Sequence, residues 1–165
     1  MSAGAGRDAE PREATAGDAA APPGVADVAA LAPLLLFDGS CGLCDRRVRF
    51  ALARDVAGVL RVAPLDGETA ARVRASVAVP DVDSVVVLER DADGAPRVLV
   101  RSDAALAVLR RLGAPWPLVA RVAALVPRAL RDLGYRVVAR TRYAVFGRVA
   151  ACALPRPEWR ARLLP

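Results

Sequence analysis

Apolar and polar positions form a regular pattern only from about residue 34 onward. The apolar run at 34–37 is closed by Asp38 and Gly39, which predicts a buried strand ending in a tight turn. The segment 42–54 then places apolar residues at helical spacing, with arginines over much of the opposite face, which predicts an amphipathic helix. A second strand and a second helix follow, at 60–63 and 68–76.

The middle of the chain predicts a β-hairpin. Residues 84–88 are mostly β-branched, which is typical of a buried strand, and the segment 91–95 is rich in Asp and Gly, which is typical of a turn. The apolar run at 97–100 then supplies the second strand of the hairpin.

The last third of the chain predicts helices. Ser102 is placed to cap a helix at 103–112, and Gly113 is placed to end it. Prolines separate two further predicted helices, at about 116–126 and 128–143. The order of strand, helix, strand, helix, hairpin and further helices predicts one α/β domain.

The first thirty residues differ in kind from the rest. They are Ala, Gly, Pro and acidic residues without a period, so we expect 1–30 to be a disordered tail and 31–165 to form the domain. Acidic residues such as Asp8 and Glu10 occupy positions where a signal peptide is basic or apolar, and the apolar stretch 116–126 is too short to span a bilayer. We therefore expect a cytoplasmic protein.

Positive charge is concentrated at the C-terminal end. The chain of 165 residues has a net charge of +6, all its basic residues are arginine, and the last 65 residues hold 13 of them against 3 acidic residues. Few aromatic residues are interleaved with these arginines, so we do not expect nucleic-acid binding. An acidic protein or lipid headgroups stay open as partners of a basic surface.

Two of the three cysteines carry the candidate chemistry. Cys41 and Cys44 lie three positions apart where the first strand gives way to the first helix, so their side chains share one face and a reversible disulfide is feasible. At a helix N-terminus, unpaired backbone N–H groups stabilise a thiolate. We therefore interpret Cys41 as a nucleophile and Cys44 as the thiol that resolves a mixed disulfide.

Other interpretations of the same residues remain open. Asp38 either accepts a proton from Cys44 or caps the turn through nearby backbone N–H groups. A zinc site would need further ligands, for which only Cys152 is at hand, and the cysteines could instead be inert core residues. In that last case the domain would be a redox-inert binding module that uses its basic C-terminal helices.

The segment 37–50, FDGSCGLCDRRVRF, resembles the DCC family of predicted thiol-disulfide oxidoreductases, which is named for an Asp, Cys, Cys signature. The resemblance extends from about residue 34 to 164, through APLDGETA and DSVVVLE to CALPRPEWRARLL. It implies a thioredoxin-like central sheet with additional C-terminal helices, and Asp38, Cys41 and Cys44 as the signature residues. Such a protein would exchange disulfides with a protein or small-molecule thiol or disulfide substrate and would need no bound cofactor.

The resemblance also sets expectations for residues away from the signature. Thioredoxins place a cis-proline before the third strand, where this chain has Asp83 and Ser84. Cys152 matches the family's C-terminal cysteine, and we expect it to be buried. Three aromatic residues are expected to pack the terminal helices onto the sheet: Tyr143, Phe146 and Trp159.

Overall fold

The computed structural model describes residues 24–80, 85–148 and 157–165. Its elements are α1 (Val25–Ala29), β1 (Leu34–Phe37), α2 (Gly42–Arg54), β2 (Arg61–Pro64), α3 (Glu68–Ser76), β3 (Val86–Arg90), β4 (Pro96–Val100), α4 (Arg101–Arg111), α5 (Trp116–Ala124), α6 (Arg128–Phe146) and α7 (Pro157–Arg160).

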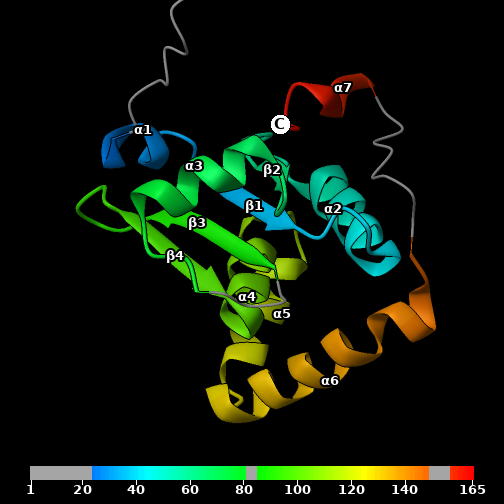
Figure 1. The fold of residues 1–165 in the computed structure, drawn as a ribbon. Helices are drawn as coiled ribbons and strands as arrows, with labels where there is room; N and C mark the ends of the chain where they lie inside the picture. Colours follow the sequence, from blue (N-terminus) through cyan, green and yellow to red (C-terminus); the bar gives the residue numbers. More distant parts are fainter. Residues whose placement is uncertain (1–23, 81–84, 149–156) are drawn as a thin grey trace, which may run out of the picture.

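The four strands form one mixed sheet in the order β2-β1-β3-β4. Strand β1 pairs in parallel with β2 and antiparallel with β3, which in turn pairs antiparallel with β4. Helices cover both faces of the sheet, and α6 extends away below α2 (Figure 1). This arrangement confirms the predicted thioredoxin-like α/β sheet with additional C-terminal helices.

Strand β1 is apolar at every position because both of its faces are covered. Leu34 and Leu36 point into a core shared with α1 and α3. Leu35 and Phe37 point into a second core, which α2 and α4 close on the other face. A strand buried on both faces has no polar positions, which explains the unbroken apolar run in the sequence.

The predicted hairpin is confirmed. Its turn is held by the Asp91 carboxylate, which accepts hydrogen bonds from the backbone N–H groups of Asp93 and Ala95 at 3.1 and 2.8 Å. Gly94 has a φ of 82°, a conformation that glycine adopts without steric cost. The turn therefore follows from the Asp and Gly residues that predicted it.

The predicted cap of α4 is wrong. The helix begins at Arg101, its N-cap is Val100, and no side chain caps it. Ser102 lies inside the first turn, where its hydroxyl donates a short hydrogen bond to Asp132 of α6. A contact with a distant helix thus takes the place of the local cap that the sequence suggested.

Two predicted boundaries also differ from the structure. Val25–Ala29, which the sequence analysis placed in the tail, form α1, and Val28 is fully buried against the sheet. Helix α6 continues to Phe146, beyond its predicted end at 143. Residues 1–23 lie outside the described part of the chain.

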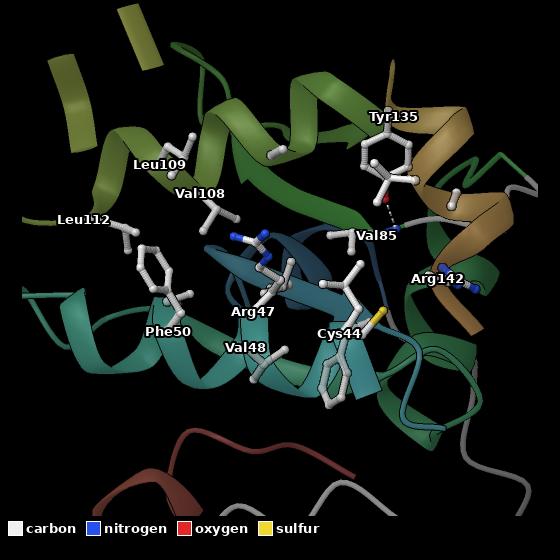
Figure 2. Close-up of a pocket in the computed structure, with 17 residues that line it drawn as sticks. Cys44, Arg47, Val48, Phe50, Val85, Val108, Leu109, Leu112, Tyr135 and Arg142 are labelled. Atoms are coloured by element: carbon white, nitrogen blue, oxygen red, sulfur yellow. Dashed lines mark hydrogen bonds between the residues drawn. The ribbon is translucent and has the colours of Figure 1, made fainter. Parts of the chain in front are cut away.

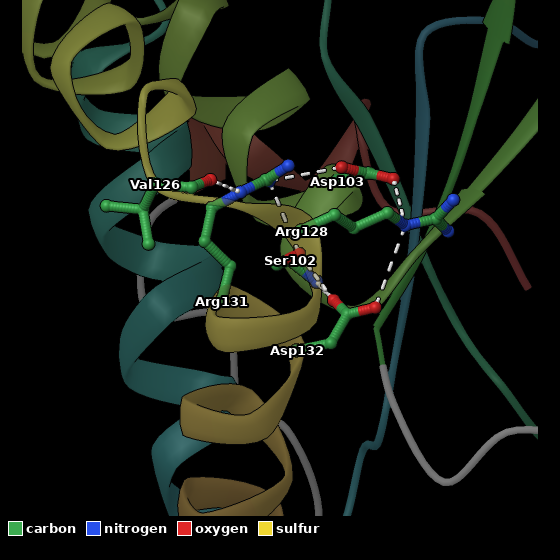
Figure 3. Close-up of polar contacts among 6 residues, drawn as sticks. All are labelled: Ser102, Asp103, Val126, Arg128, Arg131 and Asp132. Atoms are coloured by element: carbon green, nitrogen blue, oxygen red, sulfur yellow. Dashed lines mark hydrogen bonds and ion pairs between the residues drawn. The ribbon is translucent and has the colours of Figure 1, made fainter.

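The start of α6 is fixed to the start of α4 by a polar cluster (Figure 3). Asp132 accepts hydrogen bonds from the backbone and side chain of Ser102, and Arg131 donates to Asp103 at 3.1 Å. Arg128 lies between Asp103 and Asp132, at 3.1 and 3.7 Å. These contacts fix the position of the start of α6 against α4.

The end of the chain returns to the edge of the sheet beside β2. The N–H of Val62 donates to the Arg162 carbonyl, and the N–H of Leu164 donates to the Val62 carbonyl, both at 2.8 Å. Trp159 is buried in the same core as α2, as the sequence predicted, whereas Phe146 is 39% exposed, so its predicted packing is wrong. No helix in the described ranges is both long and apolar enough to cross a bilayer.

Candidate active site at the start of α2

The two cysteines lie where β1 passes into α2. Cys41 is the N-cap residue of α2, and its Sγ accepts a hydrogen bond from the backbone N–H of Cys44 at 3.4 Å. Both side chains are buried, with exposed fractions of 0% for Cys41 and 6% for Cys44. The predicted placement of the pair at a helix N-terminus is therefore confirmed.

The surroundings of Cys44 favour its protonated form. Burial, the hydrogen bond to Cys41 and the charge of Cys41 together raise the pKa of the Cys44 thiol to about 12. The guanidinium of Arg142 acts in the opposite direction, and the carboxylate of Asp38 adds to the rise. Cys44 consequently holds its proton at neutral pH.

Asp38 is the centre of a hydrogen-bonded group that we call the Asp38 cluster: Asp38, Ser40, Arg142 and Tyr143. One carboxylate oxygen accepts from the backbone N–H and the hydroxyl of Ser40, at 2.9 and 2.8 Å. The other accepts from the Arg142 guanidinium at 3.0 Å and from the Tyr143 hydroxyl. The cluster thus joins the end of β1 to the last third of α6.

The same contacts determine the charge of the cluster. Burial alone would raise the pKa of Asp38, but hydrogen bonds from Tyr143 and Ser40 and the charge of Arg142 outweigh it, so this pKa lies below its usual value. The hydrogen bond to Asp38, together with burial, raises the pKa of Tyr143. Asp38 is therefore ionised at neutral pH, and Tyr143 is a hydrogen-bond donor.

The end of α6 covers the start of α2. The N–H of Gly42 donates to the Gly147 carbonyl at 3.3 Å, and Cys41 forms an isolated antiparallel bridge with Arg148. A Cβ atom on Gly42 would lie 2.6 Å from the Phe146 carbonyl oxygen, so only glycine fits there without a shift. This cover contributes to the complete burial of Cys41.

A cavity of about 270 Å³ lies beside the cysteines, between α2, α4 and α6. Its walls are mostly apolar, and Cys44 lines it, whereas Cys41 does not. Figure 2 shows Cys44 and Arg142 at one end and Phe50 and Leu112 at the other. A ligand in this cavity would therefore have access to the Cys44 end of the pair.

The structure brings together Asp38, Cys41 and Cys44 as the sequence suggested, and it adds residues that the sequence did not single out. Arg142 and Tyr143 bind Asp38 from more than 100 positions away. Arg142 is one of 13 arginines in the last 65 residues, and nothing in the local pattern marks it as 3% exposed.

Some predictions cannot be compared with the structure. Cys152 and the pair Asp83 and Ser84 lie outside the described residues. Within the ranges that the structure covers, no group of three or more His, Cys, Asp or Glu side chains is arranged to hold a metal ion.

Comparisons with known proteins identify one family and two relatives. Residues 35–148 match the DCC1-like thiol-disulfide oxidoreductase family. The chain is 38% identical over 134 residues to the uncharacterized protein YuxK of Bacillus subtilis, covering 80% of this chain and 93% of that one. It is 35% identical over 124 residues to the chloroplastic DCC family protein At1g52590 of Arabidopsis thaliana, covering 74% and 69% of the two chains.

No solved structure matches the chain. The family match covers well over half of the sequence and includes Asp38, Cys41, Cys44, Arg142 and Tyr143. The chain therefore belongs to the DCC1-like thiol-disulfide oxidoreductase family.

Proposed function

We propose that this protein exchanges disulfides through Cys41 and Cys44, with Cys41 as the nucleophile. The observation that carries the proposal is the position of Cys41 as the N-cap of α2, with its sulfur 3.4 Å from the backbone nitrogen of Cys44. Backbone N–H groups at a helix N-terminus stabilise a thiolate, and residues three apart in the first turn can be bridged. Membership of the family supports the same activity.

The proposed reaction has two steps. The Cys41 thiolate attacks one sulfur of the substrate disulfide, which forms a mixed disulfide and releases the other substrate sulfur as a thiolate. Cys44 then loses its proton and attacks the Cys41 sulfur, which releases the second substrate sulfur and forms the 41–44 disulfide. The protein loses two electrons to the substrate, and the protons given up by Cys41, when its thiolate forms, and by Cys44 balance those that the two released substrate sulfurs take up.

The environment of Cys44 suits this order of events. Two of the causes that raise its pKa, the hydrogen bond and the charge, come from Cys41. Once Cys41 is bonded to a substrate sulfur its thiolate charge is gone, so the pKa of Cys44 falls while Arg142 still favours the thiolate. Cys44 thus becomes a better nucleophile only after the mixed disulfide has formed.

We assign Asp38 a positioning role rather than that of a proton acceptor. Four donors already bind its carboxylate, and a carboxyl whose pKa is lowered is a weak base toward a thiol. Through Arg142 and Tyr143 it holds α6 over the start of α2. Because Cys41 is fully buried there, exchange requires the end of α6 to move aside.

A redox titration tests the activity. The protein is equilibrated in glutathione buffers of graded potential, free thiols are alkylated, and the modified cysteines are mapped by peptide mass. We expect a reversible two-electron transition confined to Cys41 and Cys44, between about −270 and −120 mV. Thiols that stay reduced throughout would contradict the proposal.

Single cysteine variants test the two roles, and a Cys152→Ser background keeps the third thiol out of the reaction. Cys44→Ser should trap a stable mixed disulfide on Cys41, because nothing resolves it. Cys41→Ser should form no such adduct. An adduct that forms on Cys44 in the Cys41→Ser protein would reverse the assignment.

A redox-inert binding module remains the second candidate, and the full burial of Cys41 favours it. In that case Cys41→Ser would leave partner binding intact, whereas substitution of exposed arginines on α6, such as Arg136 and Arg140, would weaken it. For a disulfide exchange enzyme, Cys41→Ser would abolish exchange, and the arginine substitutions would leave exchange intact.

A further inference from the structure

The cavity beside Cys44 is elongated and apolar. Cys44 and Phe50 both line it from α2, and six residues of helix place their backbones about 9 Å apart. Val108 and Leu109 of α4, with Leu112 directly after the helix, form the opposite wall (Figure 2). Tyr135, Val138 and Ala139 of α6 close a further side.

The charged groups of the cavity are all positive. Its lining includes Arg47 and Arg142 and no acidic side chain. Arg142 is already engaged by Asp38 at 3.0 Å. Arg47, three residues after Cys44 on α2, is exposed and forms no ion pair with any carboxylate in the described parts of the chain.

The two exposed arginines that follow Cys44 on α2 differ in their relation to the cavity. Arg46 and Arg47 are neighbours on α2, but only Arg47 lines the cavity. Figure 2 shows the Arg47 guanidinium directed from α2 toward α4, between the two ends of the cavity.

We propose that this cavity binds a small amphiphilic disulfide, in which an aliphatic chain joins the disulfide to a terminal anionic group. The aliphatic part lies among the apolar side chains, the disulfide lies at the Cys44 end, and Arg47 pairs with the anion. Apolar walls with a few placed polar groups are typical of small-molecule sites. The inference rests on the exchange activity proposed above and names its substrate class.

The reaction is balanced for a disulfide whose two sulfur atoms belong to one ring, as in lipoic acid. Once the end of α6 has moved aside and exposed Cys41, its thiolate attacks one ring sulfur at the Cys44 end of the cavity, the ring S–S bond breaks, and the other ring sulfur leaves as a thiolate that takes up a proton. Cys44 loses its proton and attacks Cys41, which releases the first sulfur as a thiolate that is protonated in turn. The substrate becomes a dithiol, and the protein becomes a disulfide.

Three disulfides separate the contributions of charge and chain. Lipoic acid has an aliphatic chain and a carboxylate, lipoamide has the same chain without the charge, and hydroxyethyl disulfide is small and neutral. The fully reduced protein is mixed with a large excess of each disulfide and quenched with acid at early times, because dihydrolipoic acid is itself a strong reductant; after alkylation, the initial rate of formation of the 41–44 disulfide is measured by mass. We expect lipoic acid to react fastest and hydroxyethyl disulfide slowest.

Matched variants test the two walls of the site. Arg47→Gln should lower the ratio of the lipoic acid rate to the lipoamide rate about fivefold, whereas Arg46→Gln should leave it unchanged. Ala105, which is exposed on α4 but lines the cavity, offers a second variant with little risk to folding. Ala105→Phe should slow both lipoyl substrates about tenfold relative to hydroxyethyl disulfide, because the ring fills the cavity.

Binding without redox chemistry separates this inference from the proposed function. Octanoate is titrated into the reduced protein and followed by calorimetry; Arg47→Gln and Ala105→Phe should weaken its binding, and Arg46→Gln should not. If no disulfide oxidises the protein, the exchange activity is refuted, and octanoate alone decides the ligand class. The inference is overturned if octanoate does not bind, or if hydroxyethyl disulfide reacts while neither variant alters the preference for lipoic acid.

Discussion

The backbone N–H of Gly42 donates a hydrogen bond to the carbonyl of Gly147 at 3.3 Å, and this contact brings the end of α6 onto the start of α2. Gly42 is the first residue between the two cysteines, and its missing side chain admits the Phe146 carbonyl. Gly147 has a φ of 69°, a backbone conformation that favours glycine. The two glycines together allow the approach that covers Cys41.

Gly42→Ala tests this cover. The new Cβ would lie 2.6 Å from the Phe146 carbonyl oxygen, so the end of α6 must shift. We expect Cys41 to react with iodoacetamide about tenfold faster, and the free energy of unfolding to fall by about 1–3 kcal/mol. Quenched alkylation with peptide mass mapping measures the first effect, and urea unfolding measures the second.

Gly134→Ala is the matched control. Gly134 lies inside α6, and a Cβ there would meet nothing within 4 Å. Replacing an unconstrained helical glycine should stabilise the protein by about 0.5–1 kcal/mol and leave the alkylation rate of Cys41 unchanged. Equal rates for Gly42→Ala and the native protein would show that α6 does not limit access to Cys41.

Tyr143→Phe removes one donor from the Asp38 cluster. Because the Tyr143 hydrogen bond lowers the pKa of Asp38 and burial opposes it, loss of the hydroxyl should raise this pKa toward or above its usual value. We expect the free energy of unfolding to fall by about 2 kcal/mol. A carbon-detected NMR titration of the Asp38 carboxyl measures the pKa.

Tyr135→Phe provides the comparison for Tyr143→Phe. Tyr135 also lies on α6, but its hydroxyl accepts a hydrogen bond from the N–H of Val85 at 3.0 Å. This variant should leave the pKa of Asp38 where it is. An Asp38 pKa that is the same in both variants would mean that the Tyr143 hydroxyl does not act on the carboxylate.

Local patterns were sufficient for most of the fold. The run at 34–37 predicted β1 because all four of its residues are buried, and the helical spacing at 42–54 predicted α2 because the apolar residues on one face of the helix are buried. The Asp and Gly turn predicted the hairpin for a local reason as well, since Asp91 bonds to backbone only two and four residues on. Ser102 misled because its partner, Asp132, lies 30 positions away.

In the candidate site, too, the features with a local cause could be predicted, and those that depend on tertiary contacts could not. The spacing of Cys41 and Cys44 predicted their placement because a helix N-terminus is a local feature. The partners of Asp38 depend on where α6 passes the start of α2, and the tertiary contacts between α4 and α6 determine that position. For this reason, no periodicity in the sequence distinguishes Arg142 from the other arginines of α6.

The reactivity of Cys44 toward iodoacetamide should depend on the state of Cys41. In the native protein the pKa of Cys44 is about 12, so its rate should still rise with pH at pH 10 without reaching a plateau. In Cys41→Ala the hydrogen bond and the charge of Cys41 are absent, but burial, the largest cause, remains. The midpoint for Cys44 should therefore fall, yet stay above the usual thiol value of about 8.5.

Peptide mapping across a pH series distinguishes Cys44 from the other thiols, and Cys152→Ser simplifies the analysis. The same midpoint with and without Cys41 would contradict any electrostatic link between the two cysteines. A midpoint near 8.5 in both proteins would show that Cys44 is not held in its protonated form by burial.

The contact between Ser102 and Asp132 makes the docking of α6 sensitive to acid. The Ser102 hydrogen bond is the main cause of the lowered pKa of Asp132, with the charge of Arg128 also contributing. A carboxyl whose pKa is lower in the folded state stabilises that state fully above its unfolded pKa of about 4, and this contribution is lost as the pH falls through the folded value.

Ser102→Ala should therefore reduce the free energy of unfolding by about 1–2 kcal/mol at pH 7, and by less at pH 3. Urea unfolding between pH 7 and 3 measures the difference, with Ser76→Ala as a control because that hydroxyl donates to the Arg72 carbonyl of its own helix, α3. A loss for Ser102→Ala that is the same at pH 7 and pH 3 would mean that the hydroxyl does not act through the charge of Asp132.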